Sequence, residues 1–154
     1  MKTRTTILSI ALCLVAATVC FASNLNMGTW KLNEAKSKFS AGAGKNTTVV
    51  YEAEGDKVKV TVDGVDSDGT PTHNEWTGNF DGKFYPVTGD PASDSRAYKK
   101  INGRTLGLTV KKDGKVTSSG RITVAPNGKS RTVITTGIDS KGKTIRSAAV
   151  YDKM

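Results

Sequence analysis

Hydrophobic and polar residues alternate along most of this chain, in short runs separated by turn-forming pairs. Val58, Val60 and Val62 alternate with polar residues in one run, and Leu106 and Leu108 do so in another. A period of two places such residues on one face of a β-strand. The pattern therefore predicts a succession of half-buried strands.

The turn-forming pairs include Asp81-Gly82, Asn102-Gly103 and Asp113-Gly114. Pairs of this kind indicate β-hairpins, because both central residues of a type I′ turn need a positive φ. Helical periodicity is confined to 33–38, where Asn33 is placed to cap one short turn. The segments between the turns predict ten strands, at 27–33, 46–54, 57–63, 71–80, 83–87, 95–101, 104–112, 115–124, 129–136 and 143–151.

Consecutive hairpins of this kind predict an all-β fold in which each strand pairs with the next. We expect an antiparallel up-and-down β-barrel of about 8–10 strands, because closing the sheet removes the edges that would otherwise aggregate. A two-sheet β-sandwich is the alternative, since no local signal distinguishes the two.

The first 22 residues have the pattern of an export signal. Lys2 and Arg4 are followed by an uncharged apolar run, and the small residues Cys20 and Ala22 precede a cleavage site before Ser23. The apolar run, about 16 residues, is short for a bilayer span, which needs about 20. We therefore expect residues 1–22 to be removed.

Cleavage would leave a single domain, residues 23–154, in the periplasm or outside the cell, without a transmembrane segment. Cys13 and Cys20 are the two cysteines of the chain, and both lie in the predicted signal. The mature domain would then have no disulfide, no thiol chemistry and no cysteine metal site.

Charge divides the mature chain into two halves. Residues 23–90 hold 7 basic and 10 acidic residues, whereas 91–154 hold 14 basic and 4 acidic residues. The basic half favours an anionic partner, such as envelope glycans or lipid headgroups. The alternative is that these side chains are solvated positions that keep a barrel soluble. Export and the scarcity of aromatic residues argue against nucleic acid.

Few residues are candidates for catalysis. His73 is the one histidine, and no Gly-x-Ser-x-Gly motif is present. We expect Asn74 and Trp76 to face inward on their strand, which leaves His73 exposed and without a partner. One histidine cannot anchor a catalytic zinc site, which needs three protein ligands. The sequence therefore predicts no enzyme activity, no metal and no cofactor.

The segment from Asp66 to Glu75 has carboxylates spaced as in a calcium-binding loop, with Asp68 and Gly69 between them. The first ligand position, however, is Gly64 rather than an aspartate, and strands replace the flanking helices of such a loop. We expect a plain hairpin turn here.

The remaining candidate site is the barrel interior. Residues 23–154 hold nine aromatic side chains, and the predicted inward faces are rich in Thr, Ser, Gly and Ala. Either a cavity remains, which would hold a small hydrophobic or amphipathic molecule, or the barrel flattens until it closes on itself. In the first case we expect the pocket to be lined by Tyr51, Val60, Trp76, Phe84, Leu108, Ile122 and Tyr151. In the second these residues are ordinary core.

The two ends of the mature chain resemble a known superfamily. The opening Gly28-Thr29-Trp30-Lys31-Leu32 resembles the Gly-x-Trp strand of the calycins, which include lipocalins and fatty-acid-binding proteins, and Val150-Tyr151-Asp152-Lys153 resembles the closing strand of the fatty-acid-binding branch. The segment "GTWKLN…KSKF" also resembles the opening of small secreted bacterial proteins of unknown function. The calycin resemblance implies that Trp30 is a structural plug at the closed end, with Arg146 as its cover.

The sequence departs from the fatty-acid-binding pattern at two places. Residues 34–45 are too short and too glycine-rich for the helical lid of that branch. In the fatty-acid-binding proteins, an Arg-x-Tyr motif in the last strand holds the carboxylate of the ligand. In this chain Tyr151 matches the tyrosine of the motif, and Ala149 stands at the position of its arginine. That carboxylate site does not transfer to this chain.

These observations predict an exported, non-enzymatic binding protein that holds a small, partly apolar molecule inside a barrel. The alternative is a structural or surface-interaction domain without a small ligand, whose basic C-terminal half contacts anionic envelope material.

Overall fold

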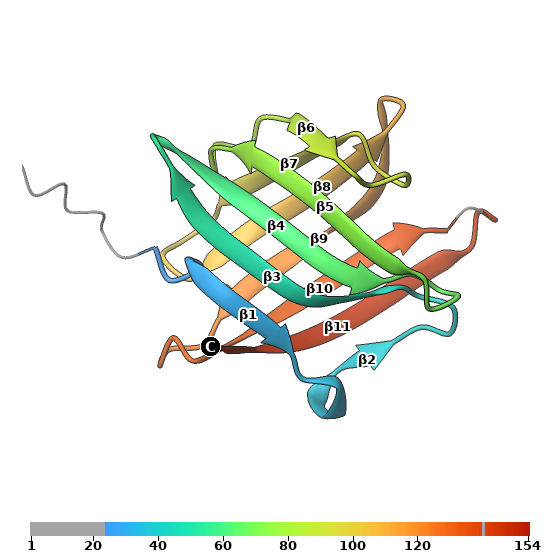
Figure 1. The fold of residues 1–154 in the computed structure, drawn as a ribbon, viewed down its shortest axis with the longest axis horizontal. Coiled ribbons are helices and arrows are strands. Elements are labelled where there is room, and N and C mark those ends of the chain that lie inside the picture. The colour runs from blue at the N-terminus through green and yellow to red at the C-terminus, as the bar shows by residue number, and fades with distance from the viewer. Residues whose placement is uncertain (1–23, 140) are drawn as a thin grey trace, which may run out of the picture.

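A computed structural model describes residues 24–139 and 141–154, so the predicted export signal at 1–22 lies outside the described residues. The described chain forms one antiparallel sheet and a short 3-10 helix, η1 (Figure 1). The elements are β1 Gly28–Leu32, η1 Glu34–Lys36, β2 Lys38–Phe39, β3 Lys45–Glu54, β4 Lys57–Val65, β5 Pro71–Gly78, β6 Tyr85–Thr88, β7 Ser95–Lys100, β8 Thr105–Lys112, β9 Lys115–Val124, β10 Ser130–Ile138 and β11 Thr144–Lys153.

The sheet closes on itself through β1, which pairs with β3 on one side and with β11 on the other. Trp30, for example, lies opposite Val49 of β3 and Lys153 of β11. From β3 to β11 each strand pairs with the next in sequence. The predicted up-and-down β-barrel is therefore confirmed, and closure excludes the alternative of two separate sheets.

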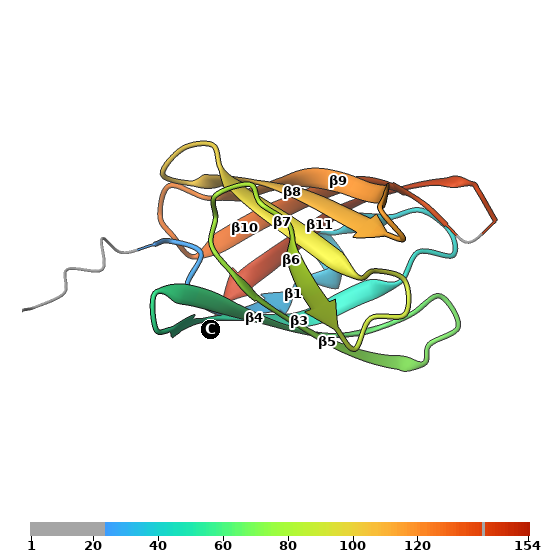
Figure 2. The same cartoon turned by 90° about the horizontal axis from the view of Figure 1, so that it is seen from above.

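The barrel is flattened in cross-section. Figure 2 shows β3, β4 and β5 in one layer and β8, β9 and β10 in the other. The pairing that joins the layers through β6 is short, with two residue pairs to β5 and two to β7. Since chain order follows sheet order, the acidic and basic halves of the sequence occupy opposite sides of the barrel.

The ends of the strands follow the turn residues closely. At the β8–β9 hairpin, Asp113 has φ 49° and Gly114 has φ 74°, as the type I′ prediction requires. The same prediction is wrong at Asn102-Gly103, where Gly103 does not have a positive φ. There the Asn102 side chain shapes the loop instead, because its Oδ1 accepts a hydrogen bond from the Arg104 backbone N–H at 2.9 Å.

The predicted helical turn after β1 is confirmed as η1. The Asn33 Oδ1 accepts a hydrogen bond from the backbone N–H of Lys36 at 3.2 Å, which caps the turn. The Asn33 amide also donates to Asp152 at 2.7 Å. The next strand, β2, has two residues and pairs with β11. The sequence pattern did not predict it.

The aromatic core fills one end of the barrel, where β1 and the end of β11 meet. Trp76 packs edge-on against Tyr98, with the ring centroids 4.7 Å apart, and stacks against Phe80 at 6.3 Å. Trp30 is fully buried, and its indole N–H donates to the Asn26 carbonyl at 2.7 Å. We call this the packed end. The opposite end, next to segments 40–44, 89–94 and 141–143, is called the open end. In the described part of the chain, no helix is long and apolar enough to cross a membrane.

Candidate binding cavity

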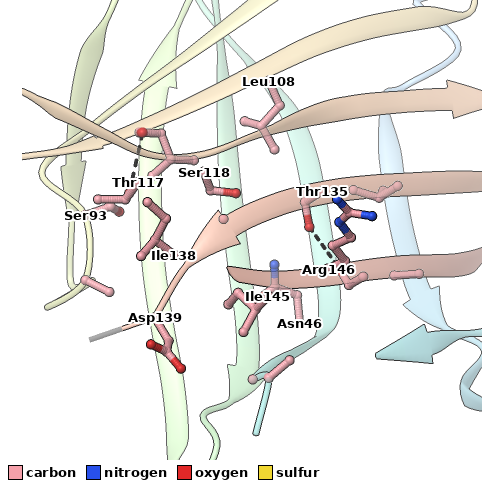
Figure 3. A pocket seen from close by; sticks show the side chains of 18 of the residues that line it. Asn46, Ser93, Leu108, Thr117, Ser118, Thr135, Ile138, Asp139, Ile145 and Arg146 are labelled. Atoms are coloured by element: carbon pink, nitrogen blue, oxygen red, sulfur yellow. Dashed lines mark hydrogen bonds between the residues drawn. The ribbon is translucent and has the colours of Figure 1, made fainter. Parts of the chain in front are cut away.

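The interior toward the open end is hollow. Two overlapping pockets, each of about 510 Å³, occupy it and share much of their lining. Figure 3 shows Leu108, Ser118, Thr135 and Ile145 among the side chains around this space. Residues common to both pockets are Gly44, Asn46, Asp90, Ala92, Leu108, Val110, Ser118, Val133, Thr135, Asp139, Ile145 and Tyr151.

The cavity exists because small residues stand opposite larger ones across neighbouring strands. Val110 of β8 is paired with Ser118 of β9, and Val133 of β10 is paired with Ala149 of β11. A serine or alanine in such a pair leaves room that a second large side chain would fill. The predicted inward faces rich in small residues therefore do leave an interior space.

The cavity wall combines apolar and hydroxyl side chains. Leu108, Val133 and Ile145 provide apolar surface, and the Thr135 and Ser147 hydroxyls are hydrogen-bonded to each other at 2.7 Å. Binding sites for small molecules have this composition, with a mostly apolar lining and a few polar groups that fix orientation. The volume is also within the range of such sites, about 300–1,000 Å³.

Arg131 of β10 lies at the inner end of the cavity and is 2% exposed. Its guanidinium carbon is 4.7 Å from the ring centroid of Trp30, 4.9 Å from Tyr51 and 5.0 Å from Tyr151. These rings attract the cation through their π faces. Within the described residues, Arg131 Nε and Nη1 are buried without a hydrogen-bond acceptor.

The tyrosines beside Arg131 stay neutral at ordinary pH. Burial raises the pKa of Tyr51 far above its usual value, with Tyr98 acting in the same direction and Arg131 in the opposite direction. Burial also raises the pKa of Tyr151 to about 12. The Tyr151 hydroxyl donates to the Asn46 carbonyl at 3.0 Å, which links the packed end to the start of β3.

A second arginine, Arg96 of β7, lines the wall of the cavity and is 8% exposed. Its Nη2 donates to Asn74 Oδ1 at 3.1 Å and lies 4.0 Å from Asp90 Oδ2. The Asp90 carboxylate also accepts from the Ser93 hydroxyl at 2.6 Å. Arg96 is thus held by polar partners from two other segments, whereas Arg131 is held mainly by aromatic rings.

The structure separates the predicted pocket residues into three groups. Tyr51, Leu108, Ile122 and Tyr151 line the cavity. Val60 and Trp76 are fully buried in the packed end, so they belong to the core rather than to the cavity wall.

Phe84 forms the third group, because its predicted inward orientation is wrong. It is 40% exposed, and Lys111 Nζ lies 3.8 Å from its ring centroid. On β6 the inward positions are those of Tyr85, which packs against Trp76 at 5.7 Å, and of buried Val87. A one-residue error of register exchanges the two faces of a strand.

The predicted plug residue Trp30 lies at the packed end, but Arg146 does not cover it. Arg146 is exposed near the mouth of the cavity, where its backbone N–H bonds to the Ser40 hydroxyl. The arginine over Trp30 is Arg131. The period of two along β10 could have identified Arg131 as an inward residue, because Arg131 shares the inward face with Val133 and Thr135.

His73 lies on the outer face of β5, as predicted, but it has partners. Its Nδ1 is 2.6 Å from Asp63 Oδ1, and its Nε2 is 3.8 Å from Glu75 Oε1. The hydrogen bond to Asp63 raises the pKa of His73, and burial opposes this. Asp63 and His73 are directly opposite in the β4–β5 register. The expectation of an unpartnered histidine is therefore wrong.

The acidic segment after β4 is a hairpin turn. Asp66 Oδ1 accepts from the backbone N–H groups of Asp68 and Thr70, and Asp68 Oδ1 also accepts from Thr70. These carboxylates serve the turn itself. Across the described ranges, no group of three or more histidine, cysteine, aspartate or glutamate side chains is arranged to hold a metal ion.

Comparison with known proteins gives few matches. No family model matches this sequence, and no curated protein matches it. Among solved structures, the chain is similar to EF1p2_mFAP2b bound to DFHBI, at 13% identity over 86% of this chain and 97% of that chain, with a TM-score of 0.48. It is also similar to a redesigned β-barrel, mFAP1, bound to DFHBI, at 16% identity over 84% of this chain and 95% of that chain, with a TM-score of 0.48.

Proposed function

We propose that this chain is a binding protein whose barrel holds a small, partly apolar molecule in the cavity at the open end. The observation that carries this proposal is the hollow of about 510 Å³ between inward faces that are otherwise closely packed. Its wall offers apolar side chains and hydroxyls, and the aromatic packed end lies beneath it. A preformed site of this kind binds without a large ordering cost.

The proposed role is binding rather than catalysis. The one histidine of the chain is on the outer face, paired with Asp63, and is not among the residues that line the cavity. Export also remains part of the proposal and rests on the signal-like pattern of residues 1–22.

A lumen-filling variant tests the function with the uncharged dye N-phenyl-1-naphthylamine. We expect the dye to gain fluorescence on binding the wild-type protein. Ser118→Trp should weaken binding by about tenfold or more, because the new side chain occupies the space in which the dye lies. Ser119→Trp is the matched control, since Ser119 is exposed on the outer face of the same strand.

Two outcomes would overturn this proposal. One is wild-type protein that does not bind the dye or any other small apolar probe at micromolar concentrations. The other is dye binding that Ser118→Trp leaves unchanged while Ser119→Trp removes it, which would place the site on the outer face.

The second candidate function, contact with anionic envelope material, has its own support. A shallow outer groove over β7–β9 exposes Phe84 and Ile101 beside Lys99 and Arg121. Apolar side chains flanked by cations suit an anionic surface. Salt-sensitive cosedimentation with vesicles containing phosphatidylglycerol would favour this function, and its absence would count against it.

A further inference from the structure

The least satisfied group in the interior is the guanidinium of Arg131. Nε and Nη1 are buried, and neither makes a hydrogen bond within the described chain. A guanidinium stays charged at every ordinary pH and carries five N–H donors. Burying such a group without acceptors is costly, and aromatic faces compensate only part of that cost.

No negative charge of the described residues balances Arg131. None of their salt bridges includes it. Three acids line the cavity: Asp90 lies beside Arg96, and Asp66 and Asp139 accept backbone hydrogen bonds in their own turns. Tyr51 and Tyr151 remain protonated because burial raises both of their pKa values. The inner end of the cavity therefore carries an uncompensated positive charge.

We propose that the ligand is an organic monoanion whose carboxylate lies on the cavity side of the Arg131 guanidinium, with its partly apolar body against Leu108, Val133 and Ile145. This inference rests on the proposed function and adds the charge and the orientation of the ligand. Arg96, on the same cavity wall, adds a second attraction to the anion. The Arg-x-Tyr carboxylate site of the fatty-acid-binding proteins does not supply this contact, since Ala149 replaces its arginine.

Wild-type protein tests the inference without any substitution. The probes are 2-naphthoate and 2-naphthamide, which differ in charge but little in shape, and each displaces N-phenyl-1-naphthylamine. A charge-assisted contact predicts that naphthoate binds about tenfold more tightly than naphthamide, and less so as salt is raised. Equal affinities would overturn the inference and leave the proposed function standing.

Arg131→Met then localises the effect, because methionine keeps much of the side-chain volume and removes the charge. We expect the preference for naphthoate to disappear while the affinity for naphthamide stays within about threefold. Arg121→Met is the matched control, since it removes the same charge from the outer face of β9. It should keep the preference.

The remaining outcomes are also decisive. If Arg131→Met folds and still prefers naphthoate, the anion does not lie at Arg131 and the inference is wrong. If Arg131→Met does not fold, the wild-type comparison and the variant Arg131→Lys decide, because lysine keeps the charge and should keep the preference. Failure of all probes to bind wild-type protein would instead overturn the proposed function.

Discussion

The packed end and the open end of this barrel are built from the same strands, yet one is solid and the other hollow. Along β11 the inward residues run from Ile145 and Ser147 at the open end, through Ala149, to Tyr151 at the packed end. On β10, Thr135 faces the cavity, and Arg131 lies against the aromatic rings of the packed end. The inward side chains are larger at the packed end than at the open end, so their size contributes to the difference in filling.

This difference indicates that the two ends have different roles: the packed end contributes to stability, and the open end contributes to the proposed binding. The packed end holds the fully buried residues Trp30, Val60 and Val124. Burial of apolar side chains of this kind stabilises the fold. The open end leaves surface uncovered that a ligand would cover. Substitutions should therefore affect stability at one end and binding at the other.

The largest expected effect is that of Trp30→Ala at the packed end. Removing a fully buried indole leaves a cavity and should lower the free energy of unfolding by about 3–5 kcal/mol. Urea denaturation followed by circular dichroism measures the loss. Ser147→Ala at the open end is the comparison and should cost less than about 1.5 kcal/mol, the net contribution of its hydrogen bond to Thr135. Equal losses of unfolding free energy in Trp30→Ala and Ser147→Ala would contradict this difference between the two ends.

Substitutions that add side-chain volume should also lower stability more at the packed end than at the open end. Val60→Phe places extra volume in the packed end and should cost about 1–3 kcal/mol of stability. Ser118→Phe places still more volume at the open end but should cost less, because the cavity accommodates the ring. The same denaturation measurement compares them. A greater loss for Ser118→Phe than for Val60→Phe would mean that the cavity is not available to a side chain.

The smallest expected effect lies outside both ends, at His73. Its pKa is raised by the hydrogen bond to Asp63, so the pair's contribution to stability is fully present below the ordinary value of 6.5 and is lost as pH rises through the raised value. Proton NMR of this single histidine should give a pKa above 6.5. In Asp63→Asn the pKa should fall toward 6.5, although Glu75 keeps it slightly raised. An unshifted His73 in the wild-type protein would contradict the pairing.

Much of the fold could be predicted from the sequence because its signals are local. Alternation marked the ten barrel strands, and the Asp113-Gly114 pair marked a type I′ turn, since φ preferences act within a few residues. The errors came where local signals conflict. In 83–87, Phe84 and Tyr85 are adjacent aromatic residues, and only contact with Trp76 determines which of them faces inward.

The cavity was harder to predict than the strands. Tyr51, Leu108, Ile122 and Tyr151 lie in its lining, and so does Arg131, which was not among the predicted pocket residues. When one strand is considered alone, a charged residue at an inward position breaks the alternation of apolar and polar residues. Its environment comes from Trp30, Tyr51 and Tyr151, which belong to strands far apart in sequence.

The strands, most of their turns and the inward side of most strands follow from the sequence alone, because these features depend on neighbouring residues and on a period of two. Tertiary contacts determine that β1 closes the sheet against β11, that the interior is filled at one end and open at the other, and that Arg131 lies beneath the cavity. These features depend on how side chains from distant strands share one volume, and no local pattern specifies that volume.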